Sequence, residues 1–381
     1  MLEMLLGGAL ALLAGQEASR VDPAKVDAAI RKGVDHLKDR IGKYGTLNTR
    51  RSEELILWTF VHAGVPETDA SFKDLFKTVT ETKLEWTYNV SLQAMILEEL
   101  ERVRHQGRIL QCAQFLADNQ CRNGQWSYGE PTAAVKDVPT GGGRDTASGG
   151  GKVRAYDPSM PVAERKKPRV TRKVAVRRSK DGPAVGDNSN SQYAALGLRA
   201  CHDAGILLPA EVVASAEKWW RESGHEGEKT GWSYQKKNDP APYGSMTAGA
   251  VGGLLIYDYI QNRPWKKDRE VVSGLEWMAD RLSVTENPGI GGEGGGQGGW
   301  LFYYLYAMER AGIYYGTERL GRHEWYAEGA RMLLDVQNAD GSWMSKGADH
   351  AIWDTCFAIL FLRRATRPLQ DVASVDRAKG S

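Results

Sequence analysis

Two carboxylates, Asp187 and Asp354, stand at the beginning of long apolar runs in the sequence. Asp187 opens the polar stretch 187–191, and Asp354 is followed two residues later by Cys356. A carboxylate at the start of a buried helix could serve as a general acid or base. Aspartate is also a residue type that commonly caps a helix N-terminus. Asp187 and Asp354 are therefore the candidate catalytic residues, with helix capping as the competing interpretation.

Other polar and aromatic side chains lie near the starts of the same apolar runs. If several such starts met at one mouth of a cavity, convergent carboxylates, phenols and imidazoles would support proton transfer or sugar binding. The candidate ligand-binding residues are Asn190, Gln192, Tyr193, Tyr243, Glu293, Trp353 and His350.

A metal site and a cofactor are not predicted. His350, Asp354 and Cys356 could touch a metal at one helix start, but capping and core roles are the favoured interpretation of these residues. The sequence has no Cys-x-x-Cys pair, so we expect buried thiols, although a bridge between 112 and 121 could form if a helix ended between them. The four cysteines are Cys112, Cys121, Cys201 and Cys356.

The elements that must position these residues are repeated along the chain. Segments 113–126 and 330–343 share Ala, an apolar residue, Leu, Gln, Gly and Trp at the same six offsets. Such self-similarity is typical of repeat architectures. The first half of each segment has helical spacing, and the second half is a tight turn that carries a tryptophan.

A second repeated feature is the ending Ala-Gly-aliphatic, which closes apolar helical runs at 63–65, 204–206 and 311–313. Glycine just past a helix can adopt the left-handed conformation. Two kinds of helix ending therefore predict a repeating helical hairpin.

Six helical hairpins follow from these signals. The first helix of most pairs is amphipathic, whereas the second is apolar on nearly all sides, as expected for an outer and an inner layer. The predicted pairs are 26–40 with 52–63, 72–83 with 88–103, 109–126 with 190–204, 210–223 with 246–261, 268–282 with 300–311, and 324–337 with 351–364.

Composition adds few constraints on partners. The chain has 381 residues, 41% of them hydrophobic, twelve tryptophans and a formal net charge of only +2.

Residues 130–186 form a basic insertion, which holds thirteen Lys or Arg against four Asp or Glu between 136 and 180. We expect a flexible, solvated loop, in which 169–178 could form a hairpin strand. It could instead contact an anionic membrane surface or an acidic polysaccharide; nucleic acid is disfavoured because Tyr156 is its one aromatic residue.

Residues 1–18 form a candidate signal peptide with an apolar core too short to span a bilayer. We therefore expect export to the periplasm or the outside of the cell. The leading residues lack Lys and Arg, so a frayed N-terminal helix on a cytoplasmic protein is the alternative. Residues 19–381 are expected to form a single domain.

The turn segments resemble the QW repeats of the squalene cyclase and prenyltransferase (terpenoid cyclase) superfamily. Gln120, Gly124 and Trp126 match that repeat, as do 337, 341 and 343, while Gly231 and Trp232 form a degraded copy without the glutamine. The resemblance covers roughly 26–364 apart from the insertion. It implies an all-α fold, an (α/α)6 toroid with an inner and an outer ring around a central cavity. It also implies that each Gln caps a helix end and each Trp stacks on it.

The catalytic signatures of the superfamily are missing from their expected places. Squalene cyclases use Asp-x-Asp-Asp-Thr, but the matching stretch 187–191 has Ser189 and Asn190 where paired carboxylates would stand. The zinc ligands of protein prenyltransferases include a His after Asp-x-Cys, and no His follows Cys356. The resemblance therefore implies a toroid that binds an isoprenoid-like lipid or a partner chain in its cavity. The alternative is an enzyme, either a cyclase or transferase with displaced acids or a glycan-acting lyase or hydrolase that uses carboxylates at the cavity mouth.

Overall fold

The structure is a computed structural model, which describes residues 21–41, 52–130, 167–235, 241–289, 299–345 and 351–369. Within these ranges the chain forms twelve helices and two strands of two residues each. The predicted all-α class is confirmed. None of the helices in these ranges has the length and apolar composition that a bilayer crossing requires. The candidate signal peptide, 1–18, lies outside the described residues.

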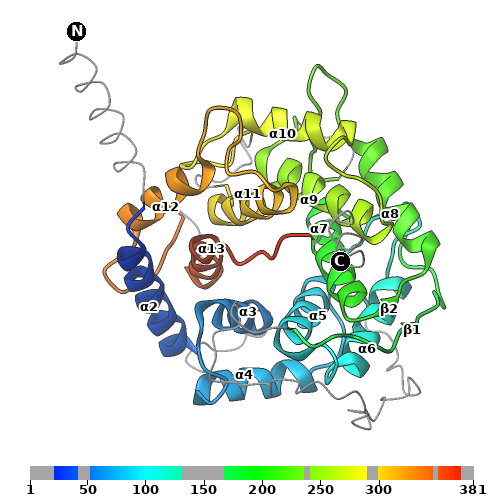
Figure 1. The fold of residues 1–381 in the computed structure, drawn as a ribbon, viewed down its shortest axis with the longest axis horizontal. Coiled ribbons are helices and arrows are strands. Elements are labelled where there is room, and N and C mark those ends of the chain that lie inside the picture. The colour runs from blue at the N-terminus through cyan, green and yellow to red at the C-terminus, as the bar shows by residue number, and fades with distance from the viewer. Residues whose placement is uncertain are drawn as a thin grey trace, which may run out of the picture.

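Six described helices lie around the centre of the molecule (Figure 1). They are α3 (Glu53–Ala63), α5 (Thr87–Glu101), α7 (Asn188–Asp203), α9 (Gly244–Ile260), α11 (Leu301–Tyr315) and α13 (Ala351–Arg363). These inner helices are buried on nearly every side; in α9 all residues from 244 to 258 are buried. Each packs against the next along the chain, and α13 packs against α3. Helices without a polar face need such neighbours all around them.

The other six described helices lie outside the inner ones and bury one face each (Figure 1). They are α2 (Pro23–Arg40), α4 (Ala70–Glu81), α6 (Gln106–Asp118), α8 (Ala210–Ser223), α10 (Arg269–Arg281) and α12 (Trp325–Val336). Three begin with a capping aspartate whose side chain accepts backbone N–H groups: Asp22, Asp69 and Asp268. The alternation of amphipathic and apolar helices in the sequence therefore matches the outer and inner positions.

The repeated tryptophans cap their own outer helices. Trp126 Nε1 donates to the carbonyl of Leu116 at 2.8 Å, and Trp343 Nε1 donates to the carbonyl of Leu333 at the same distance. Both indoles are fully buried. Each indole thus satisfies a carbonyl near the C-terminus of its helix, which would otherwise be left without a partner.

The repeated glutamines reach the neighbouring outer helix. Gln120 Nε2 donates to the carbonyl of Val212 on α8 at 2.8 Å, and Gln337 Nε2 donates to that of Ala29 on α2 at 2.9 Å. The resemblance had implied that the glutamine caps a helix end and the tryptophan stacks on it. Instead, the indole N–H does the capping, because the glutamine amide bridges the glycine carbonyl of its own turn and a carbonyl of the neighbouring outer helix.

The described end of the insertion, 167–186, packs on the helices. Strand β1 (Val174–Ala175) pairs in parallel with β2 (Ile206–Leu207), which follows α7. A strand does form within 169–178, but its pairing is parallel and not that of the expected hairpin. Val176 is buried and donates from its backbone to the Leu207 carbonyl at 3.2 Å, so the alternating valines find their partner across α7 rather than in a local turn. Residues 131–166 lie outside the described residues.

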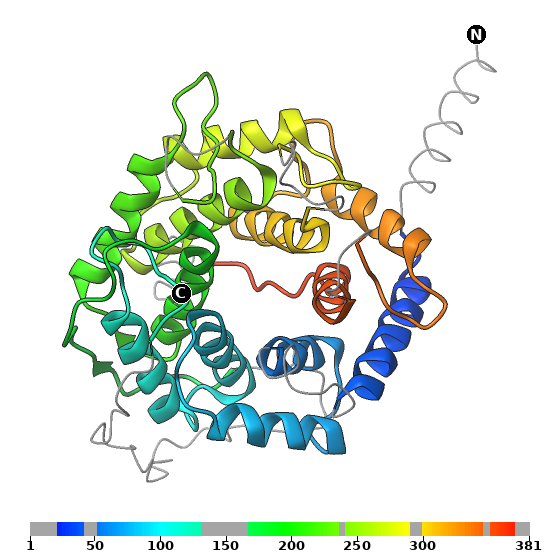
Figure 2. The same ribbon diagram turned by 180° about the vertical axis from the view of Figure 1, so that it is seen from behind.

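The segment after α13 crosses the centre of the molecule toward α7, as Figures 1 and 2 show from opposite sides. Thr366 donates through its backbone N–H and its hydroxyl to the carboxylate of Glu309 on α11, at 3.1 and 2.6 Å. Arg367 pairs with Glu99 on α5, with Nε to Oε1 at 2.7 Å. This segment therefore covers the C-terminal ends of inner helices.

Candidate functional site

A cavity of about 400 Å³ lies where the first turns of the inner helices meet. Every inner helix contributes at least one side chain to its wall. The lining residues are Leu55, Trp86, Tyr88, Asn89, Leu92, Tyr128, Ser189, Tyr193, Tyr234, Tyr243, Ser245, Met246, Trp300, Tyr303, Trp353 and Phe357.

The wall of this cavity is aromatic. Ten of its sixteen lining side chains are Trp, Tyr or Phe, and none of these described lining residues carries a charge. Aromatic rings offer large apolar surfaces, while phenol and indole groups add hydrogen-bonding positions. A concave apolar wall with a few polar groups is typical of a small-molecule site.

Helical spacing explains how a single face of each helix reaches the cavity. Residues four apart lie on one face of a helix. Three inner helices present such a pair: Tyr88 and Leu92 on α5, Ser189 and Tyr193 on α7, and Trp353 and Phe357 on α13.

Trp300 forms part of the mouth of the cavity. Its side chain is 43% exposed, and its ring stacks on that of Trp353 with centroids 6.0 Å apart. The backbone of Trp300 is left-handed, with φ 60° and ψ 40°. This conformation is unfavourable for a bulky side chain, and such strain is concentrated at functional sites. Its persistence here places a large aromatic ring at the entrance.

Asp187 caps α7 and does not line the cavity. Its Oδ1 accepts from the backbone N–H of Asn190 at 2.8 Å and from the Ser189 hydroxyl at 2.6 Å. Its Oδ2 accepts from the Asn190 side-chain amide at 2.8 Å. Both oxygens are therefore committed to the first turn of their own helix, and Asn190 is buried with them. The neighbouring Ser189 is the residue of this stretch that reaches the cavity.

Asp354 is likewise buried, at 2% exposure, and its Oδ2 accepts from the backbone N–H of Ser345 at 2.8 Å. It is not among the lining residues. Of the candidate ligand-binding residues, Tyr193, Tyr243 and Trp353 do line the cavity. Glu293 and His350 lie outside the described residues.

Gln192 lies behind the wall rather than in it. Its Nε2 donates to Tyr303 Oη at 2.5 Å, and its Oε1 accepts from Arg310 Nη2 at 3.0 Å. The neighbouring residues Glu309 and Arg310 have different partners. Glu309 accepts hydrogen bonds from Thr366, while Arg310 donates to Gln192 and lies over the ring of Tyr306, 4.2 Å from its centroid.

Sequence reasoning missed most of the aromatic wall. Trp86, Tyr88, Trp300 and Tyr303 all lie at or just inside the start of an inner helix. That shared position was the available signal, because the predicted helix starts already located the mouth. The sequence candidates included three aromatic residues, Tyr193, Tyr243 and Trp353. The other aromatic residues of the wall belong to types that are also common in cores, so their role was not apparent from type alone.

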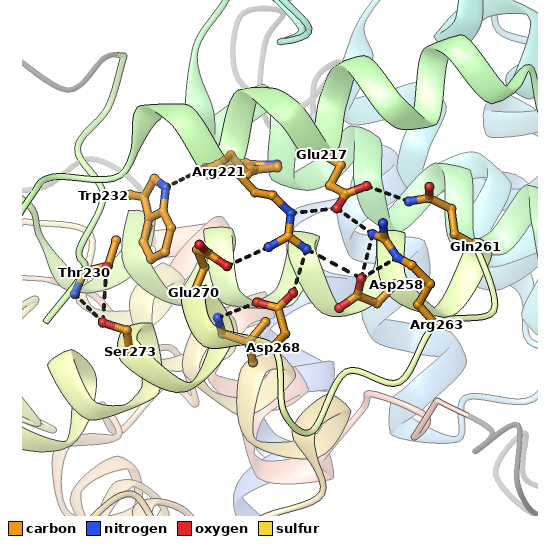
Figure 3. Close-up of polar contacts among 12 residues, drawn as sticks. Glu217, Arg221, Thr230, Trp232, Asp258, Gln261, Arg263, Asp268, Glu270 and Ser273 are labelled. Carbon is orange, nitrogen blue, oxygen red and sulfur yellow. Dashed lines mark hydrogen bonds and ion pairs between the residues drawn. The ribbon is translucent and has the colours of Figure 1, made fainter.

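A network of charged side chains joins α8, α9 and α10 (Figure 3). None of its residues lines the cavity. Arg221 pairs with Glu217 and Asp268 at 2.6 Å and with Glu270 at 2.7 Å. Arg263 joins the group through Asp258 at 2.7 Å. Burial raises the pKa of Asp258 to about 6, and nearby Asp268 adds to that effect. Two arginines compensate the charge of these carboxylates, and their ion pairs connect the three helices.

The cysteines are free and buried, as expected. Burial raises the pKa of Cys112 and of Cys356 to about 12, which makes both poor nucleophiles and metal ligands. In the described part of the chain, no three His, Cys, Asp or Glu side chains gather in a way that could hold a metal ion.

The comparisons with known proteins assign no family to this geometry. The chain matches no protein-family model, and no curated protein matches it.

Proposed function

We propose that this protein is an (α/α)6 toroid, similar to squalene cyclases and prenyltransferases, that binds an isoprenoid-like lipid in its aromatic cavity. The binding role does not include their acid-catalysed or zinc-dependent chemistry. The observation that carries the proposal is the wall of ten aromatic side chains, without a charged group among the described lining residues. The contacts of α13 with α3 support a closed ring of inner helices.

A binding role fits the wall better than either enzymatic alternative. Protonation of an alkene needs a positioned, strongly acidic group, and Asp187 and Asp354 are occupied by backbone and side-chain donors. Glycoside hydrolysis needs two carboxyl groups on either side of the substrate. The described lining residues supply neither arrangement, whereas aromatic side chains suit an apolar chain.

The test is the binding of farnesol, a simple isoprenoid alcohol, to the full chain by isothermal titration calorimetry. Trp353→Ala removes a ring from the cavity wall and should weaken binding about tenfold or more, as expected for a buried aromatic anchor. Trp277→Ala is the matched control, since Trp277 is a buried tryptophan on α10, away from the cavity. It should leave the affinity unchanged. Equal losses in both variants, or no binding to the unmodified chain, would refute the proposal.

A second measurement separates binding from catalysis. The full chain is incubated with farnesyl diphosphate or with an oligosaccharide panel, and products are sought by mass spectrometry. We expect none. Turnover that Asp354→Asn abolishes while circular dichroism stays unchanged would establish the enzymatic alternative instead.

Export and surface contact form a separate part of the proposal. The candidate signal peptide supports secretion, and the surplus of positive charge in 136–180 supports contact with an anionic surface. Sequencing the N-terminus of the mature protein after expression in a secreting host tests the first. Binding to vesicles that contain phosphatidylserine, measured at increasing salt concentration, tests the contact with an anionic surface. Binding whose affinity does not fall with salt would contradict it.

A further inference from the structure

Arg310 is a buried cation directly behind the aromatic wall. Only 3% of the residue is exposed, and its guanidinium lies 4.2 Å from the ring centroid of Tyr306 and 5.6 Å from that of Tyr193. Within the described chain, its Nη1 has no hydrogen-bond partner. Arginine stays protonated in proteins, so a full positive charge persists here. Aromatic faces compensate it only in part.

A chain of hydrogen bonds leads from Arg310 to the cavity. Arginine can only donate, so Nη2 fixes Gln192 Oε1 as the acceptor at 3.0 Å. The amide nitrogen of Gln192 then donates to Tyr303 Oη at 2.5 Å. The Tyr303 hydroxyl lies 3.2 Å from the hydroxyl of Tyr88. Because Gln192 Nε2 is a donor, Tyr88 Oη is the acceptor that remains for the Tyr303 hydrogen among the described residues.

With these donors and acceptors assigned, the hydroxyl hydrogen of Tyr88 is left at the cavity end of the hydrogen-bond series. Tyr88 lines the cavity beside Ser189, whose own hydrogen is already donated to Asp187. Burial raises the pKa of Tyr88 well above its ordinary value, with the hydroxyls of Ser189 and Tyr303 offsetting part of the shift. The phenol therefore keeps its hydrogen at every physiological pH. The wall presents a donor where the relay ends.

The dipoles of the inner helices also favour a negatively charged group in the cavity. All six inner helices direct their first turns at the cavity, so the positive ends of their dipoles converge there; that of α7 is already met by the capping carboxylate of Asp187. Loop carbonyls accept the first N–H groups of α5, α7 and α9, and the dipoles of the remaining helices still favour a negative charge. With no carboxylate among the described lining residues, the cavity favours negatively charged oxygen over a cation.

From this geometry we infer that the ligand ends in an oxyanion, with a carboxylate as the simplest case, and that this oxygen accepts a hydrogen bond from Tyr88. Arg310 acts as a positioning residue through Gln192 and Tyr303. The inference rests on the proposed function, because it names the polar end of the lipid that the aromatic wall would hold.

Three matched probes test the charge preference: farnesoic acid, farnesol and farnesylamine, each titrated into the full chain. We expect the acid to bind most tightly and the amine most weakly. Tyr88→Phe should weaken binding of the acid by about tenfold, the usual loss for a hydrogen bond to a charged group, and leave farnesol nearly unchanged. Tyr234→Phe is the matched control. Tyr234 also lines the cavity, but its hydroxyl contacts those of Tyr128 and Ser189 and none in the relay.

The outcomes separate the two proposals. If none of the probes binds, the proposed function fails. If farnesol or farnesylamine binds as tightly as the acid, lipid binding stands and the oxyanion inference is wrong. Gln192→Met keeps the volume but breaks the relay, and it should reduce the preference for acid over alcohol as Tyr88→Phe does. An unchanged preference in Gln192→Met would overturn the role of Arg310, and equal losses in Tyr88→Phe and Tyr234→Phe would overturn that of Tyr88.

Discussion

Gln337 donates a hydrogen bond of 2.9 Å to the carbonyl of Ala29, which joins two residues that are 308 positions apart. Gln120 makes the equivalent bond of 2.8 Å to Val212, between two outer helices in the middle of the chain. The last hairpin is thus fastened to the first by the same contact that fastens two successive hairpins. Arg363 on α13 and Asp27 on α2 add an ion pair of 2.8 Å across this junction.

Gln337→Ala should destabilise the protein as much as Gln120→Ala does. Each variant removes the side-chain hydrogen bond that joins two neighbouring outer helices, and we expect a loss of about 0.5–1.5 kcal/mol in the free energy of unfolding. Urea denaturation of both variants measures it. A loss in Gln120→Ala alone would mean that the first and last hairpins do not pack together in solution.

Gly341→Ala should be strongly destabilising. Gly341 has φ 86°, and a Cβ there would lie 2.3 Å from the carbonyl oxygen of Lys32. Gly64 is the matched control, with φ 79° and open space around the added atom. Gly64→Ala should cost about 1–2 kcal/mol for the left-handed backbone alone. Gly341→Ala should cost about 3 kcal/mol or more, because the clash is with backbone of α2. Equal melting temperatures for the two variants would show that this close approach is absent.

Arg221→Met should loosen the junction of α8, α9 and α10. The change leaves Glu217, Asp268 and Glu270 without their shared cation, at a cost of about 2–3 kcal/mol, between the values for exposed and fully buried pairs. Lys218→Met on the same helix is the control, because the Lys218 pair with Glu222 spans 3.8 Å and is well exposed. It should change stability by less than about 0.5 kcal/mol. Thermal denaturation compares them, and similar effects would contradict a structural role for the cluster.

Glu309→Gln should stabilise the protein at alkaline pH. Burial raises the pKa of Glu309 from 4.5 to about 7, while its hydrogen bonds with Thr366 offset part of the shift. The folded state therefore holds this proton more tightly than the unfolded state, and the associated stability is full below pH 4.5 and lost as the pH rises through 7. Glutamine keeps partners for Thr366 without the charge.

We expect Glu309→Gln to exceed the unmodified protein at pH 8 by on the order of 1–3 kcal/mol and to match it near pH 4. Melting temperatures across this range provide the measurement. Glu318→Gln is the control, since Glu318 is exposed and pairs with Arg364 at the surface. A gain in Glu309→Gln that does not depend on pH would argue against a charged, buried carboxylate.

The sequence by itself determined the helices and their two environments. The prediction of a helix over 210–223 coincides with α8, and 324–337 differs from α12 by one residue at each end. These features are local, because apolar spacing and the residues at helix ends are read within a few turns of the chain. The all-α class and the buried cysteines follow from the same local patterns.

The tertiary structure decided which side chains meet at the cavity. Tyr88 and Tyr303 are 215 positions apart, and Gln192 and Arg310 are 118 apart, yet they form one relay. Periodicity indicates that a helix is buried, but an all-apolar helix has no marked face, so its rotation and its register against five others cannot be read from its own residues. The parallel pairing of β1 with β2 could not be predicted from local sequence either, because the whole of α7 lies between the two strands in the sequence. Close packing of the assembled helices sets these contacts, and with them the chemistry of the cavity.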